Sequence, residues 1–251
     1  MNDRFKIVNS KLRISAKKSL GQNFLINEGV VEKIVTAAEL QPDDTVVEVG
    51  PGTGNLTKRL VGKVARLILI EKDRRFIETL QREFPSAEVI EGDVLTLDIK
   101  NYLQIENSKL KTFDYKIIAN LPYYITSHFF KTIFEQWPTP ERMIVMVQKE
   151  VAQRIMAQPP DANLLGLSVQ LYATPKIVTR VSAGSFRPIP NVDSVVLKLT
   201  PRTPAIGNDQ RKFLFSILRT AFAGKRKKLS NTLSVLVPES AFPAARIDPS
   251  A

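Results

Sequence analysis

The residues best suited to chemistry lie in a glycine-rich turn and at the ends of two further apolar runs. The turn is Glu48-Val49-Gly50-Pro51-Gly52-Thr53-Gly54, and it closes a short run of valines. Glu71 ends the next apolar run, 21 residues after Gly50, and Gly92-Asp93 follows the third. Glycines let the backbone pass close to a ligand, and a carboxylate at the second strand end can bind the two hydroxyls of a ribose. We therefore expect a nucleoside-containing cofactor here.

The spacing of the glycines distinguishes between two such cofactors, a dinucleotide and S-adenosylmethionine. The dinucleotide fingerprint G-x-G-x-x-G would need a glycine at position 55, which is Asn55, whereas the third glycine is Gly54. Glu48 would repel a pyrophosphate but can balance the ammonium of a methionine moiety. Asp93 can accept a hydrogen bond from an adenine amine. The pattern favours S-adenosylmethionine, with a nicotinamide-dependent oxidoreductase as the alternative.

The tetrapeptide Asn120-Leu121-Pro122-Tyr123 closes the fourth predicted strand, next to the expected cofactor crevice. These residue types suit methyl transfer to a planar exocyclic amine, whose delocalised lone pair is weakly nucleophilic. The Asn120 side-chain oxygen and the Leu121 carbonyl can accept the N–H groups of the amine and aim its lone pair. Pro122 fixes the turn, and Tyr123 can stack on the base. The alternative is a plain turn between strand and helix, with Tyr123 as core packing.

A second aromatic candidate lies in the proline-stiffened loop 185–194. Phe186 can cover the other face of an extruded base, and Arg187 can hold a phosphate. The alternative is a rigid loop in which Phe186 is buried for packing. We therefore treat Phe186 as a candidate catalytic residue, together with the Asn120–Tyr123 turn.

The composition points to a polyanionic partner and excludes several kinds of site. Lys and Arg total 36 against 25 Asp and Glu, which gives a net charge of +11. We expect nucleic-acid phosphates to contact the clustered cations Lys17, Lys18, Arg187, Lys225, Arg226, Lys227 and Lys228. The chain has no cysteine and one histidine, so thiolate and multi-histidine metal sites are excluded. We expect no metal and no membrane partner, because no apolar run approaches the length of a membrane span.

Short apolar runs alternate with amphipathic segments, which predicts a parallel sheet covered by helices on both faces. The expected strands span residues 45–49, 67–70, 87–90, 115–119 and 143–147, with an added strand pair at 176–181 and 194–199. Helices are expected after Asn27 and the glycine turn, near 74–83 and 127–136, from about 149, and over 208–235. The domains are expected to be a basic arm (1–22), a catalytic domain (23–203) and a small helical C-terminal domain (204–251).

Together these residues resemble one known family, the small-subunit rRNA adenine N6,N6-dimethyltransferases (KsgA-like). The resemblance spans about residues 17–233, and it is also carried by Ser19–Leu25, Glu71-Lys72-Asp73, Gln148–Val151 and Ala221-Phe222. It implies a Rossmann-like S-adenosylmethionine-dependent methyltransferase fold. It further implies that the cofactor is bound by Asn23, Leu25, Gly50, Glu71, Asp93 and Asn120, to which we add Glu48, Gly52, Gly54 and Val94 from the same turns.

The resemblance also implies a substrate, namely two adjacent adenosines in a hairpin loop near the 3′ end of small-subunit (16S) rRNA, within a pre-30S ribosomal particle. We expect a cytoplasmic monomer that acts in ribosome biogenesis. The family's helical domain usually continues past the equivalent of 246–249, whereas this chain ends at Ala251, so its terminus is either naturally short or clipped. Two alternatives stay open. One is a large-subunit rRNA adenine methyltransferase of the macrolide-resistance type, and the other is a non-catalytic RNA-binding or transcription factor on the same fold.

Overall fold

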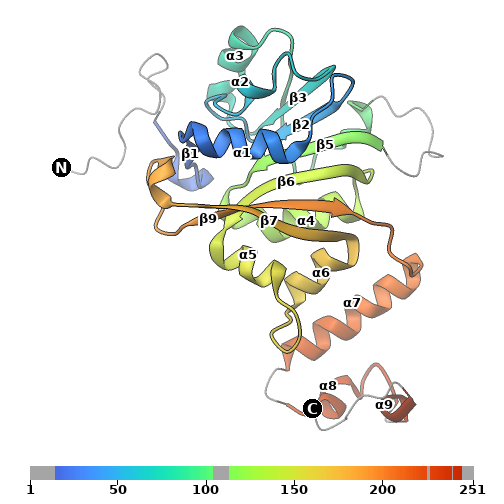
Figure 1. Cartoon of the computed structure of the whole chain (residues 1–251). Helices are drawn as coiled ribbons and strands as arrows, with labels where there is room; N and C mark the ends of the chain where they lie inside the picture. Colours follow the sequence, from blue (N-terminus) through green and yellow to red (C-terminus); the bar gives the residue numbers. More distant parts are fainter. Residues whose placement is uncertain (1–14, 104–112, 225–226, 239, 245–251) are drawn as a thin grey trace.

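The computed structural model describes residues 15–103, 113–224, 227–238 and 240–244. Its central sheet contains β2 (Thr45–Val49), β3 (Arg66–Glu71), β4 (Glu88–Glu91), β5 (Phe113–Asn120), β6 (Pro140–Gln148), β7 (Ala173–Val181) and β9 (Ser194–Pro201). The seven strands are arranged in the order β4-β3-β2-β5-β6-β9-β7 (Figure 1). The first five are parallel, and β9 and β7 are antiparallel to their neighbours. This confirms the predicted α/β class, the five parallel strands and the added strand pair.

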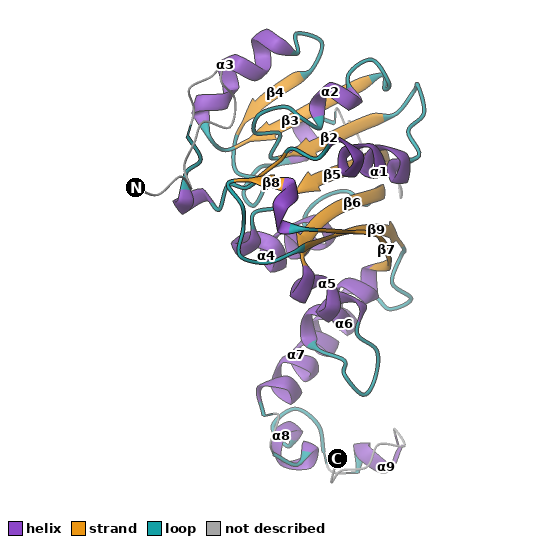
Figure 2. Cartoon of the chain, turned by 60° about the vertical axis from the view of Figure 1, so that its left-hand side comes forward, coloured by secondary structure: helices purple, strands orange, loops and turns teal. Residues whose placement is uncertain are grey.

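Helices cover both faces of this sheet (Figure 2). One face carries α1 (Glu28–Ala38), α2 (Thr57–Leu60) and α3 (Arg74–Glu83), and the other carries α4 (Thr126–Glu135), α5 (Lys149–Met156) and α6 (Leu164–Tyr172). Neighbouring residues of one strand enter opposite cores: Val46 packs with the first group of helices, and Val47 packs with the second. Both valines are completely buried, which explains why these strands read as continuous apolar runs.

Local signals account for α1 but not for α6. Asn27 caps α1 as predicted, because its side chain accepts a hydrogen bond from the Val30 N–H at 3.2 Å. The sequence analysis did not predict α6, which contains Gly166 and apolar residues on all sides. A Cβ at Gly166 would lie 2.4 Å from the Arg154 carbonyl oxygen, so the glycine permits close approach of α6 to α5. Packing between the two helices therefore outweighs the poor helix propensity of glycine.

The C-terminal residues form α7 (Asn208–Ala223), α8 (Leu229–Leu233) and α9 (Ala241–Ala244), which lie at the end of the molecule beyond α6 (Figure 1). The predicted helical segment 208–235 contains two helices, α7 and α8, because α7 ends before Gly224. A Cβ at Gly224 would lie 2.9 Å from the Thr232 side chain, so this glycine lets the chain fold back on itself. No helix within the described ranges has both the length and the apolar character needed to cross a bilayer.

The strand order explains how distant residues meet. The carboxyl ends of parallel strands share one edge of the sheet, and the order β4-β3-β2-β5 brings four strand ends together there. Asp93 follows β4, Glu71 ends β3, the glycine turn follows β2 and Asn120 ends β5. The chain order reverses between β2 and β5, which is the point where open α/β sheets bind ligands.

Candidate functional site

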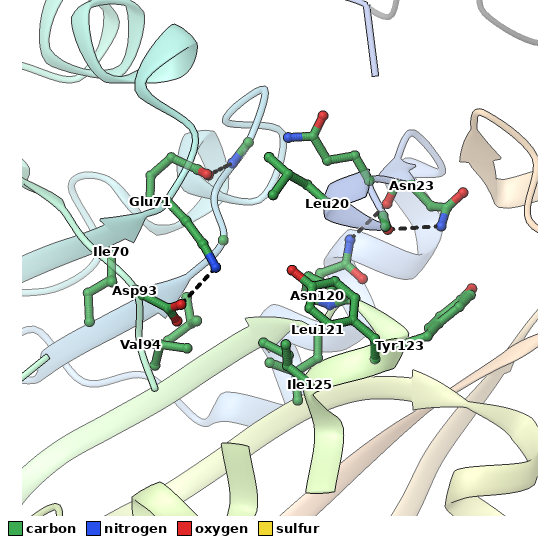
Figure 3. A pocket seen from close by; sticks show the side chains of 18 of the residues that line it. Leu20, Asn23, Ile70, Glu71, Asp93, Val94, Asn120, Leu121, Tyr123 and Ile125 are labelled. Atoms are coloured by element: carbon green, nitrogen blue, oxygen red, sulfur yellow. Dashed lines mark hydrogen bonds and ion pairs between the residues drawn. The ribbon is translucent and has the colours of Figure 1, made fainter. Parts of the chain in front are cut away.

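A cleft of about 840 Å³ opens at this edge of the sheet; we call it the strand-end cleft (Figure 3). Its floor and one side come from the strand ends, and its other side comes from the segment Leu20–Phe24 near the N-terminus. Eleven predicted site residues line it, namely Asn23, Gly50, Gly52, Glu71, Asp93, Val94, Asn120, Leu121, Pro122, Tyr123 and Phe186. Most of the predicted site residues therefore lie in one cleft, as expected for residues at the ends of parallel strands.

Three predicted cofactor residues lie elsewhere. Leu25 and Glu48 line a smaller cavity that adjoins the strand-end cleft and shares Gly50 and Asn120 with it. Gly54 lines neither cavity. A Cβ at Gly54 would lie 2.5 Å from the Phe84 ring, so the structure accounts for this glycine by packing against Phe84.

Glu71 lines the strand-end cleft, and two backbone N–H groups hold its carboxyl group. Its Oε2 accepts a hydrogen bond from the Gly52 N–H at 3.0 Å, and its Oε1 accepts one from the Asp73 N–H at 2.8 Å. Burial raises the pKa of Glu71, while these two N–H groups oppose that rise. Each carboxyl oxygen retains a lone pair, so Glu71 can accept a pair of vicinal hydroxyls.

Asp93 lies beside Glu71 and is paired with a residue that the sequence analysis did not select. The Lys72 ammonium donates to Asp93 Oδ2 at 2.7 Å, and the Leu95 N–H donates to Asp93 Oδ1 at 3.0 Å (Figure 3). Burial alone would raise the pKa of Asp93, but these hydrogen bonds outweigh it and lower the pKa. The sequence analysis named Lys72 only as part of the motif Glu71-Lys72-Asp73 and gave its side chain no role. At a strand end both residues reach the cleft.

The surroundings of Glu48 bear on its predicted role as a counter-charge to the methionine ammonium. Its side chain is almost completely buried, and the Thr57 hydroxyl donates to its Oε2 at 2.8 Å. Burial raises the pKa of Glu48 to about 8. At neutral pH the carboxyl therefore carries its proton, and it would balance a methionine ammonium only if that cation came close enough to ionise it.

The Asn120 side chain is oriented by the N-terminal segment. Its Nδ2 donates to the main-chain carbonyl of Asn23 at 3.2 Å, and the Asn23 side chain in turn donates to the Gly21 carbonyl (Figure 3). Because the amide nitrogen is engaged in this way, Oδ1 is the acceptor that Asn120 can present to an incoming amine. This geometry suits the predicted role of the side-chain oxygen.

Tyr123 lies at the far end of the strand-end cleft from Asp93. Its hydroxyl is 3.3 Å from Ser194 Oγ, and burial raises the pKa of the phenol. The ring is half-buried and lines the cleft, so it is available for stacking and is also anchored to β9. Proton transfer through the hydroxyl is not favoured, because a raised pKa keeps the phenol neutral.

A two-stranded sheet that the sequence analysis did not predict joins the N-terminal segment to the Phe186 loop. Strand β1 (Phe24–Leu25) pairs antiparallel with β8 (Phe186–Arg187), and the Ile26 N–H donates to the Ser185 carbonyl at 2.9 Å. Phe186 is 1% exposed and belongs to the core, yet it also lines the strand-end cleft. The packing interpretation of Phe186 is therefore correct, and its contact with the cleft leaves the stacking interpretation open.

The predicted phosphate-binding cations are scattered over several segments. Arg187, Lys227 and Lys228 are exposed, and Lys17 pairs with Asp73 at 3.7 Å. Lys225, Arg226 and the Lys18 side chain lie outside the described residues. In the described part of the chain, no group of three or more His, Cys, Asp or Glu side chains is arranged to hold a metal ion.

Comparisons with known proteins agree with the fold and with the resemblance. The family described as ribosomal RNA adenine dimethylase matches residues 13–250. A protein of Dehalococcoides mccartyi (strain CBDB1) named ribosomal RNA small subunit methyltransferase A is 41% identical over 225 residues, which are 88% of this chain and 75% of that protein. A protein of the same name from Clostridium botulinum (strain ATCC 19397 / Type A) is 38% identical over 97% of this chain and 90% of its own length.

Two solved structures have a similar overall fold. A dimethyladenosine transferase from Plasmodium falciparum aligns with a TM-score of 0.68 and 29% identity, over 89% of this chain and 78% of that chain. The 23S rRNA methyltransferase ErmE aligns with a TM-score of 0.68 and 27% identity, over 91% and 92% of the two chains. From the match to nearly its whole length, this chain belongs to the ribosomal RNA adenine dimethylase family.

Proposed function

We propose that this chain is an enzyme that transfers methyl groups from S-adenosylmethionine to the N6 amines of two adjacent adenosines. The substrate is a hairpin loop near the 3′ end of small-subunit (16S) rRNA. The observation that carries the proposal is the single cleft that joins Glu71 and Asp93 to the Asn120–Tyr123 turn. A nucleoside site and an amine-accepting turn thus share one cavity.

The choice of the small subunit rests on the relatives. Proteins named small subunit methyltransferase A are 37–41% identical to this chain, whereas the large-subunit enzyme ErmE is 27% identical. The two groups share the fold, so the fold alone does not select a subunit. The higher identity favours the small subunit over the macrolide-resistance alternative.

The residues of the strand-end cleft fit S-adenosylmethionine. Glu71 offers two oxygens for ribose hydroxyls, and Asp93 offers an acceptor for the adenine amine. Ile70 and Val94 supply apolar surface beside them, which suits the faces of a purine. Leu25, Glu48 and the glycine turn would hold the methionine part through the adjoining cavity. When bound, the sulfonium supplies a methyl group that is already electrophilic.

The chain's own contribution is the orientation of the amine. Asn120 Oδ1 and the Leu121 carbonyl would accept the two N–H groups of the adenine, which aims the nitrogen lone pair away from the ring. The hydrogen bond from Asn120 Nδ2 to Asn23 keeps the acceptor oxygen facing the substrate. Tyr123 would stack on the base, and Phe186 would limit the pocket behind it.

The RNA would be held by exposed cations, including Arg187 on β8 and Lys227 and Lys228 just before α8. We propose that the chain acts as a cytoplasmic monomer on a pre-30S particle. We also propose that residues 1–22, 23–203 and 204–251 serve as an arm, a catalytic domain and an RNA-docking domain. The net charge of +11 supports a polyanionic partner, and nearly all of it lies in the two end segments, residues 1–22 and 204–251.

The test presents purified, unmethylated small and large ribosomal subunits to the enzyme with S-adenosylmethionine labelled in its methyl group. The expected result is label in small-subunit RNA, recovered as N6,N6-dimethyladenosine. Label in the large subunit alone would support the macrolide-resistance type. Cofactor binding without any transfer to either subunit would instead support the non-catalytic RNA-binding factor.

A further inference from the structure

A network of charged and polar side chains ties the N-terminal segment to the end of β3. Within the segment Ser15–Leu25, residues Leu20–Phe24 line the strand-end cleft, and Asp73 stands two residues after Glu71, which also lines it. The Asp73 side chain is only 2% exposed. A carboxylate buried to this degree needs partners for both of its oxygens, and the N-terminal segment provides several of them.

The contacts of Asp73 are short and charge-assisted. Its Oδ2 accepts from Gln22 Nε2 at 2.8 Å and from Arg75 Nη2 at 2.6 Å. Its Oδ1 accepts from Arg75 Nε at 2.9 Å and pairs with the Lys17 ammonium at 3.7 Å. Burial alone would raise the pKa of Asp73, but the hydrogen bonds from Arg75 and Gln22 outweigh it and lower the pKa to about 2.

The partners of Asp73 hold the segment at further points. Gln22 Oε1 accepts from the main-chain N–H of Lys17 at 2.7 Å. Arg75 Nη1 donates to the main-chain carbonyl of Ser15 at 3.0 Å. The segment is therefore attached at Ser15, Lys17 and Gln22, and all three attachments converge on Asp73 and Arg75 at the start of α3.

The same residue is connected to the nucleoside side of the cleft. The Asp73 N–H donates to Glu71 Oε1 at 2.8 Å, so the backbone of Asp73 orients Glu71 while its side chain holds the segment. Gln22 itself lines the strand-end cleft. Loss of the Asp73 charge would leave Arg75 and Lys17 without their shared counter-charge, directly under the wall of the cleft.

We propose that Asp73 is a positioning residue that holds the segment Ser15–Leu25 closed against the strand-end cleft and thereby slows the release of the bound nucleoside. The proposal rests on the proposed function, because the nucleoside is the donor or its demethylated product. Asp73 also caps α3, since its Oδ1 accepts from the Arg75 N–H at 3.3 Å. The experiment must therefore separate the capping contact from the hold on the segment.

The test compares the full chain with Asp73→Asn, Gln22→Leu and a control, Asp98→Asn. Gln22→Leu removes the Gln22 attachment to Asp73 and leaves the α3 cap intact. Asp98 caps the short helix at Ile99–Asn101 by accepting from the Lys100 N–H at 3.1 Å, so Asp98→Asn makes the same change at a similar cap that has no contact with the segment. Two rates are measured: the dissociation of S-adenosylhomocysteine, and tryptic cleavage after Lys17 and Lys18 in the protein alone.

We expect Asp73→Asn and Gln22→Leu to speed both rates, the former by about tenfold or more, with no change in Asp98→Asn. Unchanged cleavage in both variants would overturn the hold on the segment. Faster cleavage with unchanged dissociation would overturn the link to nucleoside release.

If wild-type protein does not bind S-adenosylhomocysteine, the proposed function fails as well. If the wild-type protein binds S-adenosylhomocysteine and the variants release it at the wild-type rate, this inference is overturned and the proposed function is not affected. Gln22→Leu decides the matter if Asp73→Asn does not fold.

Discussion

Replacing Asn120 tests how the proposed methyl transfer depends on a single amide. Asn120→Ala removes the Oδ1 acceptor and the 3.2 Å hydrogen bond from Nδ2 to the Asn23 carbonyl. Loss of one preorganised hydrogen-bonding group in an active site costs about 100- to 1,000-fold in turnover. Loss of the Asn23 bond costs about 1 kcal/mol of folding stability. We therefore expect kcat to fall by about 100- to 1,000-fold, with a small loss of stability and little change in the affinity for S-adenosylhomocysteine.

Asn120→Asp sharpens the same prediction. The aspartate keeps an acceptor but lacks the N–H that donates to Asn23, so its second oxygen would face a carbonyl oxygen. If Asn23 orients residue 120, this variant loses at least about tenfold in turnover despite its acceptor.

The assay is single-turnover methyl incorporation into unmethylated small subunits, with saturating labelled donor. Full activity in Asn120→Ala would refute the role of the amide. Full activity in Asn120→Asp with low activity in Asn120→Ala would refute the orienting role of the Asn23 carbonyl.

Three further predictions concern the cleft and its supports. Glu71→Ala should weaken S-adenosylhomocysteine binding about tenfold or more in calorimetry, because carboxylate hydrogen bonds to ribose hydroxyls are lost; an unchanged Kd would remove Glu71 from the site. Gly54→Ala should destabilise the fold by about 1–3 kcal/mol in urea, since its Cβ would lie 2.5 Å from Phe84. Gly62→Ala is the matched control with a similar positive φ and open space around it, and it should cost less, about 1 kcal/mol; equal losses would contradict the clash. The pKa of Glu48 is raised from 4.5 to about 8, so its contribution to stability is present below pH 4.5 and is lost as pH rises through 8. Glu48→Gln should flatten the unfolding free energy across that pH range, and an unaltered pH profile would exclude a protonated Glu48.

Much of the site follows from the sequence because strand ends are easy to locate. Glu71, Asp93 and Asn120 each end or follow a short apolar run, and parallel strands bring such ends to one edge. The alternation of strands and helices likewise fixes the class of the fold. These signals are local in the sequence, and a parallel sheet places the ends of its strands along one edge.

The parts that escaped prediction depend on contacts distant in the sequence. Strands β1 and β8 are two residues long, too short to show periodicity, and Leu25 pairs with Phe186 across most of the chain. The raised pKa of Glu48 follows from the burial of its side chain, which no spacing reveals. The attachment of Gln22 to Asp73 spans 51 residues and involves side chains that read as ordinary surface residues.

A crystal structure of the enzyme with S-adenosylhomocysteine tests the central claim most directly. We expect the ribose hydroxyls on Glu71, the adenine beside Asp93, and the sulfur near Asn120 within the strand-end cleft. A ligand bound elsewhere, or a sulfur atom out of reach of the Asn120 turn, would contradict the assignment of donor and acceptor to one cavity.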